Sequence, residues 1–217
     1  TRNFVSRRTP VECVMRTKFL VRRAFLLYYM HMPTHASSIV KDERALRAVA
    51  RDVPHADITA EKMRRLLSGM SAALAEEDDG VALAAPQVGE PLRFFIVSGK
   101  VLARLSERAA SAQAELARRT EPLPDAVFFN PVLRKVSREK QVVEEGCLSL
   151  RYLYGQVKRA KKVTLEAYNE RGEKVVRGAS GLLAQIFQHE VDHLNGVLFI
   201  DTAADIINIP PEALKSK

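Results

Sequence analysis

Apolar residues near the C-terminus recur at three- and four-residue steps, the spacing of one face of an α-helix. The stretch SGLLAQIFQHEVDHLNG, residues 180–196, begins with Ser180 and Gly181 and ends at Gly196, residue types that are typical of helix boundaries. Apolar residues flank the polar ones closely, so the helix is expected to lie in the interior. The pattern predicts a buried amphipathic helix over this stretch.

Two further helices are predicted upstream. Residues 58–80 end at Gly80, a predicted helix stop, and carry these apolar residues at helical spacing: Met63, Leu66, Leu67, Met70 and Leu74. The methionines are expected in the core. Residues 100–123 predict a helical insertion on the surface, with an apolar side formed by Leu102, Leu105, Ala109, Ala112 and Leu116. A solvated insertion is the favoured interpretation, and a partner-docking element is the alternative.

Short β-rich runs separated by Gly, Asn and Pro occupy most of the remaining chain. They read LRFFIVS, AVFFNPVL, KQVVEE, KVTLEAY and EKVVRG, and NERG, residues 169–172, predicts a hairpin turn between the last two. Strands before and around one buried helix predict an α+β fold. We expect antiparallel β-sheets packed around a central helix at residues 180–196.

Length and charge limit the organisation of the chain. A chain of 217 residues can bury one substantial core, and a single domain over residues 32–217 is expected. The formal net charge of +8 is concentrated in residues 1–31, which hold seven basic residues against Glu12 alone. That segment, a basic N-terminal extension, therefore carries +6 and leaves only +2 for the domain. General nucleic-acid binding is not indicated.

The predicted helix at residues 180–196 contains a candidate metal site. His189, Glu190 and His193 form an HExxH pattern. At about 100° per residue the two imidazoles lie roughly 40° apart on one face, and Glu190 lies about a quarter-turn from His189. This spacing suits two metal ligands and one base. A solvated face with ion pairs is the alternative, and the apolar flanks argue against it.

A third ligand is needed, and HExxH proteins differ in its position. Phe199 stands where the metzincin pattern places its last histidine, which excludes that pattern. A downstream carboxylate would have to be Asp201, Asp205 or Glu212, in a short proline-containing tail. Upstream, Cys147 lies beside Gly146 after a strand-like run. The only other cysteine is Cys13, so a disulfide framework is not expected. A lone cysteine is most often a small buried hydrophobe, but its placement favours a thiolate ligand.

Three separated segments together resemble the signature motifs of the peptide deformylase family. They are GVALAAPQVG (80–89), EGCLSL (145–150) and QHEVDHLNG (188–196), and the resemblance extends over about residues 39–201. Each motif is moderately specific, whereas all three in this order are strong evidence. The resemblance implies a hydrolase that removes the formyl group from the initiator methionine of newly made polypeptides. It also implies a Cys-His-His metal-binding site on the HExxH helix.

Residue roles follow from the resemblance, motif position by motif position. The metal ligands would be Cys147, His189 and His193, and Glu190 would act as the acid and base. Gln87 and the backbone N–H of Leu148 would donate hydrogen bonds to the formyl oxygen. The remaining substrate contacts would come from Gly80, Val81, Ala82, Val143, Leu182 and Ile186, of which Val81, Val143, Leu182 and Ile186 would enclose the methionine side chain.

The expected cofactor is one divalent metal ion. The resemblance implies Fe²⁺ as the native ion, with Zn²⁺, Ni²⁺ or Co²⁺ in some preparations. On ligand chemistry alone, one thiolate and two imidazoles would favour zinc. The identity of the ion therefore rests on the resemblance and not on the residues.

The sequence departs from the family pattern at two places. Ala82 stands where a glycine is usual, and its methyl group is expected to narrow the substrate groove. Leu150 and Arg151 follow EGCLS where the family usually has an apolar residue and a proline. Contacts at that rim cannot be transferred from the family. Arg159 does match a family arginine, and an ion pair with Glu145 is expected.

The resemblance also implies partners and a location. N-formylmethionyl nascent peptides would be the substrates and the ribosome a transient partner. A monomer is expected, without sequence-specific nucleic-acid binding or membrane association. Residues 1–31 are Arg-rich like a transit peptide, and Ala24–Met30 is too short an apolar run to span a membrane. We favour a dispensable extension on a bacterial cytoplasmic protein, and import into a mitochondrion or other organelle is the alternative. A further interpretation is that translation starts at Met30 or Met32.

Two other functions remain open at the level of the sequence. One is a zinc endopeptidase built on the same HExxH helix, which would need neither Gln87 nor Cys147. The other is an inactive deformylase-like scaffold with an altered rim, against which the intact set of candidate ligands argues.

Overall fold

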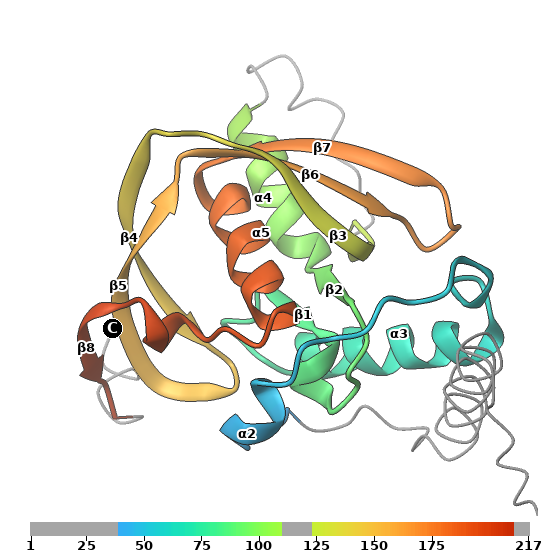
Figure 1. The fold of residues 1–217 in the computed structure, drawn as a ribbon, viewed down its shortest axis with the longest axis horizontal. Coiled ribbons are helices and arrows are strands. Elements are labelled where there is room, and N and C mark those ends of the chain that lie inside the picture. Colours follow the sequence, from blue (N-terminus) through green and yellow to red (C-terminus); the bar gives the residue numbers. More distant parts are fainter. Residues whose placement is uncertain (1–38, 110–122, 211–217) are drawn as a thin grey trace, which may run out of the picture. The chain divides into compact units, whose positions relative to one another are not determined.

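The computed structural model describes residues 39–109 and 123–210 (Figure 1). The predicted extension over residues 1–31, the C-terminal part of the insertion and Glu212 lie outside these ranges. The described part contains the α-helices α2 (Glu43–Leu46), α3 (Glu61–Ala75), α4 (Gly99–Ala109) and α5 (Gly181–Leu194). Short 3₁₀ helices are η1 (His55–Asp57), η2 (Ala85–Val88) and η4 (Phe199–Asp201).

Two antiparallel sheets form the rest of the fold. The larger has the strand order β1-β2-β3-β6-β7, made of β1 (Ala82–Ala84), β2 (Phe94–Val97), β3 (Ala126–Val136), β6 (Lys162–Tyr168) and β7 (Lys174–Ser180). The smaller has the order β4-β5-β8, made of β4 (Lys140–Cys147), β5 (Leu150–Ala160) and β8 (Ala204–Asn208). The predicted α+β class with antiparallel sheets is confirmed.

All five predicted β-rich runs form strands, and the predicted turn joins β6 to β7. Its Gly172 has φ +75°, a backbone conformation that glycine adopts without strain, and its N–H donates to the Asn169 carbonyl oxygen at 2.9 Å. Strands β1, β5 and β8 were not among the predicted runs. Strand β5 is the longest of the three. Its basic residues interrupt the apolar alternation, although β5 pairs with β4 on one side and β8 on the other.

Helix α3 is shorter than its pattern predicts. It ends at Ala75, with Glu76 as its C-cap, and does not extend to Gly80. The residues in between, Glu76–Asp79, offer no apolar side chain to the core and place negative charge at the negative end of the helix dipole. The predicted core methionines are confirmed, since Met63 and Met70 are buried.

Helix α5 packs against strands of both sheets and carries much of the core. It contacts β1, β3, β6 and β7 of the larger sheet and β5 of the smaller one (Figure 1). Phe187 packs edge-on against Phe128, with ring centroids 5.1 Å apart. Close packing of these side chains against the strands holds the helix in one orientation. The polar residues of α5 are therefore presented at a fixed place.

Helix α4 forms the first part of the predicted insertion. Its Leu102 and Leu105 pack against the core cluster, so this part of the predicted apolar stripe serves packing. Asp125 holds the start of the helix, because its carboxylate accepts a hydrogen bond from the Gly99 N–H at 2.9 Å. Within the described ranges, no helix combines the length and the apolar character needed to cross a membrane.

Candidate metal centre

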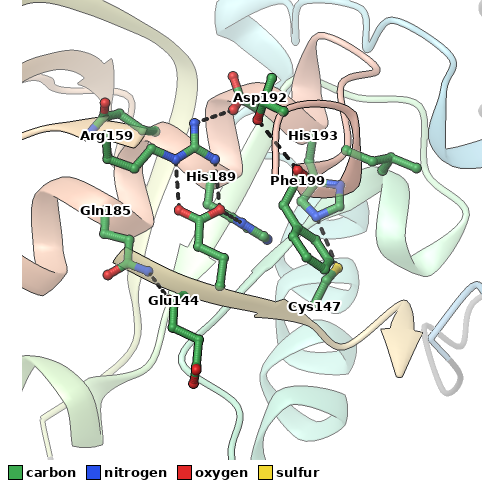
Figure 2. A network of polar contacts seen from close by, with 12 residues as sticks. Glu144, Cys147, Arg159, Gln185, His189, Asp192, His193 and Phe199 are labelled. Carbon is green, nitrogen blue, oxygen red and sulfur yellow. Dashed lines mark hydrogen bonds and ion pairs between the residues drawn. The ribbon is translucent and has the colours of Figure 1, made fainter. Parts of the chain in front are cut away.

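Three candidate ligands converge from two elements far apart in the sequence. Cys147 is the last residue of β4, and a register shift at Gly146 turns the hairpin so that Cys147 pairs with Leu150. His189 and His193 lie one turn apart on α5, with ring centroids 4.9 Å apart. One ligand atom from each of the three residues lies within 4.8 Å of the other two. Figure 2 shows the Cys147 sulfur facing His193, whose Nε2 lies 3.2 Å from it.

A buried carboxylate fixes the orientation of His189. Glu145 Oε2 lies 3.0 Å from His189 Nδ1, which leaves Nε2 of that ring free to bind a metal. The Arg159 guanidinium donates hydrogen bonds to both Glu145 oxygens at 2.7 and 2.8 Å. It also donates to Asp192 at 2.5 Å (Figure 2). The predicted Arg159–Glu145 ion pair is therefore confirmed. Its extension to His189 and Asp192 was not predicted, because these residues are distant in the sequence.

Gln87 reaches the same place from η2. Its Oε1 accepts a hydrogen bond from the Ala84 N–H at 2.8 Å, which sets the direction of the amide. Its Nε2 therefore points toward Cys147 Sγ at 3.4 Å and Ser149 Oγ at 3.3 Å. The contact with Ser149, which is buried, was missed by the sequence reasoning. This arrangement places the Gln87 amide, a buried hydrogen-bond donor, next to the candidate ligands.

Glu190 is buried in the same region. Among the described residues, its Oε2 is buried with no hydrogen-bond partner, as is His193 Nδ1. Burial raises the pKa of Glu190 to about 7, because the charged form is poorly solvated there. A carboxylate with this pKa can exchange a proton near neutral pH.

The charge states of Cys147 and Glu145 are set by neighbouring groups. Burial would raise the pKa of the Cys147 thiol, but hydrogen bonds from His189 and His193 outweigh burial and hold it well below its usual value. Burial would also raise the pKa of Glu145, yet Arg159 and His189 lower it to about 2. The site thus gathers a thiolate and a carboxylate in a poorly solvated place.

The residues present fit a divalent metal ion. A thiolate sulfur and two imidazole nitrogens are the donor types of protein zinc and iron sites, and their spacing allows one ion to contact all three. The partnerless Glu190 oxygen fits a role beside a metal-bound ligand rather than a structural role. Three protein donors leave a coordination position open for a reactant, as in catalytic sites.

A cavity of about 300 Å³ opens beside the candidate ligands. Of the predicted site residues, those that line it are Val81, Ala82, Gln87, Cys147, Leu148, Leu182, Ile186, His189 and Glu190. His193 is buried behind this surface. Val143 does not line this cavity, and Gly80 lines a neighbouring one of about 390 Å³. Tyr152, Tyr154 and Gln185 line the first cavity and were not predicted.

Replacing Arg159 by methionine is expected to lower the free energy of unfolding by about 3 to 5 kcal/mol, because it leaves Glu145 as a buried, poorly paired charge. Urea unfolding of the apoprotein measures this loss. The double variant Arg159→Met, Glu145→Gln should recover part of it. Arg134→Ala, which removes a more exposed arginine paired with Glu166, is the matched control and should change stability far less than Arg159→Met. An Arg159→Met protein as stable as this control would contradict the prediction.

Known proteins resemble this chain in sequence and in structure. Residues 37–208 match the sequence profile of the family described as polypeptide deformylase. Peptide deformylase 2 of Clostridium acetobutylicum is 35% identical over 169 residues, which cover 77% of this chain and 95% of that protein. The peptide deformylase of Microchaete diplosiphon is 32% identical over 207 residues, or 95% of this chain and 94% of that protein.

Solved structures agree with the sequence comparison. The Met-Ala-Ser-bound class I type b peptide deformylase of Acinetobacter baumannii matches with a TM-score of 0.62 and 32% identity, over 76% of this chain and 96% of that chain. The peptide deformylase of Thermotoga maritima matches with a TM-score of 0.62 and 32% identity, over 78% of this chain and 99% of that chain.

Proposed function

This chain belongs to the polypeptide deformylase family, and on that premise we propose that Cys147, His189 and His193 bind its metal ion. The family consists of metal-dependent enzymes whose known activity is removal of the formyl group from N-formylmethionine, and this chain is such an enzyme. The observation that carries the assignment of the site is the convergence of the three donor atoms within 4.8 Å.

Each residue around the ligands has a separate task in the proposed mechanism. A divalent ion bound there would supply Lewis-acid chemistry, which lowers the pKa of a water and polarises a carbonyl group. Glu190 Oε2, which has no hydrogen-bond partner among the described residues, takes a proton from the attacking water and delivers it to the departing amine. The elevated pKa of Glu190 suits both directions of this transfer.

Two donors are proposed to hold the formyl oxygen. Gln87 Nε2 is aimed toward Cys147 by the hydrogen bond that its own Oε1 accepts from Ala84. The backbone N–H of Leu148 is the second donor, since Leu148 lines the cavity directly after Cys147. Donors fixed before the substrate arrives stabilise developing negative charge without reorganising.

The methionine side chain is proposed to occupy the apolar part of the cavity. Val81, Leu182 and Ile186 line it, and Val81 and Leu182 remain partly exposed although they are apolar. Gly80 and Val143 stay candidates from the family resemblance. Ala82, buried at the start of β1, adds one methyl group to this part of the lining and so narrows the cavity.

We expect a strong preference for formyl-Met over acetyl-Met peptides. An acetyl methyl group would have to displace Gln87 or the attacking water, and even about 1 Å of misplacement can cost ~100-fold in rate. The experiment is anaerobic purification, metal analysis, and comparison of kcat/KM for formyl-Met-Ala-Ser and acetyl-Met-Ala-Ser. Equal hydrolysis of the two, or internal cleavage of an unformylated peptide, would favour the endopeptidase instead.

Finer assignments extend the proposal beyond the family activity. We propose Fe²⁺ as the native ion, for which the family resemblance is the support, and the same metal analysis tests it. The thiolate of Cys147 would make an iron site prone to oxidation, hence the anaerobic step. We also propose a cytoplasmic monomer that meets the ribosome transiently, with the HExxH helix at the centre of the fold, as its contacts to both sheets support.

A further inference from the structure

Arg151 lies in the part of the cavity wall where the sequence departs from the family pattern. It follows Leu150, the first residue of β5, and precedes Tyr152, which has a φ of +68°. That left-handed conformation is uncommon outside glycine and bends the backbone at this point. The side chain of Arg151 is about three-quarters buried, with 26% of its surface exposed.

The guanidinium of Arg151 is paired with two acids from another part of the chain. It forms an ion pair with Glu77 and a second contact with Asp79 Oδ1 at 3.3 Å. Both acids lie between the end of α3 and the start of β1. That segment leads directly to Val81 and Ala82, which line the cavity.

Arg151 and Asp79 therefore belong to two different segments that line one cavity. Asp79, Val81 and Ala82 line it from the β1 side. Cys147, Leu148 and Arg151 line it from the β4–β5 hairpin. The neighbouring cavity shares Asp79 and Val81 with the first and is also lined by Glu77. The Arg151 ion pairs thus join the two walls at the boundary between the two cavities.

We propose that Arg151 is a positioning residue for the substrate peptide: through Glu77 and Asp79 it sets the separation between the β1 wall and the Cys147–Leu148 wall. This inference rests on the proposed function, because the substrate must lie between those walls. A change in wall separation alters how well a peptide is held. The metal ligands themselves are set by other contacts, those of α5 and of Glu145.

The exposed contact with Asp79 implies sensitivity to salt, whereas the mostly buried pair with Glu77 is screened less. Asp79 keeps 60% of its side-chain surface exposed, so mobile ions reach this contact. Raising the salt concentration from about 0.1 M to about 1 M shortens the Debye length from about 10 Å to about 3 Å. Substrate affinity of the unmodified enzyme should therefore weaken with salt, and a protein without Arg151 should lose most of that dependence.

The test compares Arg151→Ala, the double variant Glu77→Gln, Asp79→Asn, and the triple variant in the metal-loaded enzyme. Arg134→Ala serves as the control, because it removes an arginine–glutamate pair from the larger sheet, although Arg134 is more exposed than Arg151. We measure kcat and KM with formyl-Met-Ala-Ser, metal content, and the Kd of the product Met-Ala-Ser by calorimetry. Product binding needs no turnover, which separates this proposal from the proposed function.

We expect Arg151→Ala to raise KM and the product Kd about 10-fold, with kcat and metal content nearly unchanged. The double variant should show a similar loss, and the triple variant should be no worse than either, because contacting residues couple and their effects do not add. Unchanged product binding in Arg151→Ala would overturn the proposal. Additive losses would also overturn it, since they would mean that Arg151 contacts the peptide directly. An unmodified enzyme that binds Met-Ala-Ser but releases no formate would instead refute the proposed function.

Discussion

Replacing His193 by alanine is expected to abolish tight metal binding, and with it deformylation. The site would keep only Cys147 and His189, and two protein donors do not fix an ion in a four-coordinate geometry. Cys147→Ala should behave in the same way, because it also removes one of three donors. Metal content after dialysis, measured beside turnover of formyl-Met-Ala-Ser, checks both variants.

The matched control is His55→Ala, which removes an exposed histidine bonded to the Gly172 carbonyl oxygen, away from the candidate site. It should keep its metal and its rate. Circular dichroism must show that the His193 variant is folded, since His193 is buried. A folded His193→Ala protein with one bound ion per chain would show that the Cys-His-His assignment is wrong.

Glu190→Gln is expected to keep the metal and lose most turnover. The amide nearly preserves the shape of the carboxylate, and Glu190 is not among the three converging donors. What it loses is the capacity to accept and return a proton, and general acid–base catalysis typically contributes ~100- to 10,000-fold. The loss should appear in kcat, with the affinity for Met-Ala-Ser nearly unchanged.

Glu139→Gln, on a mainly exposed acid paired with Lys161, gives the matched control. Its kcat should equal that of the unmodified enzyme. If Glu190→Gln retained more than about a tenth of the rate, another group would have to accept the proton, because this effect is usually at least ~100-fold.

The sequence predicted helix α5 and most long strands, because each has its hydrophobic pattern within one continuous stretch of the chain. Helix α5 lies within the predicted range, and Gly196 has the positive φ, +73°, of a residue that follows a helix end. Strands β2, β3, β4, β6 and β7 appeared as apolar runs. Strands β1, β5 and β8 did not: β1 and β8 are short, and charged and aromatic residues interrupt the apolar alternation of β5.

Contacts at the site were predictable only where the family motifs carry them. The motifs indicated Cys147, His189 and His193, and the fold brings them together. Contacts between distant residues left no such signal: Ser149 with Gln87, Asp192 with Arg159, and Arg151 with Glu77. Each depends on how the two sheets and the α3–β1 segment meet in space, which no single stretch of sequence records.

The separation of the candidate ligands along the chain would link metal affinity to folding. In the unfolded chain His189 and His193 remain close together, whereas Cys147, in the β4–β5 hairpin, is distant from them in the sequence. The third donor arrives only when that hairpin docks against α5. By thermodynamic linkage, the ion then stabilises the docked state by the difference between its affinities for the folded and unfolded chains. Metal affinity in this protein is therefore also a measure of how completely its two sheets have assembled.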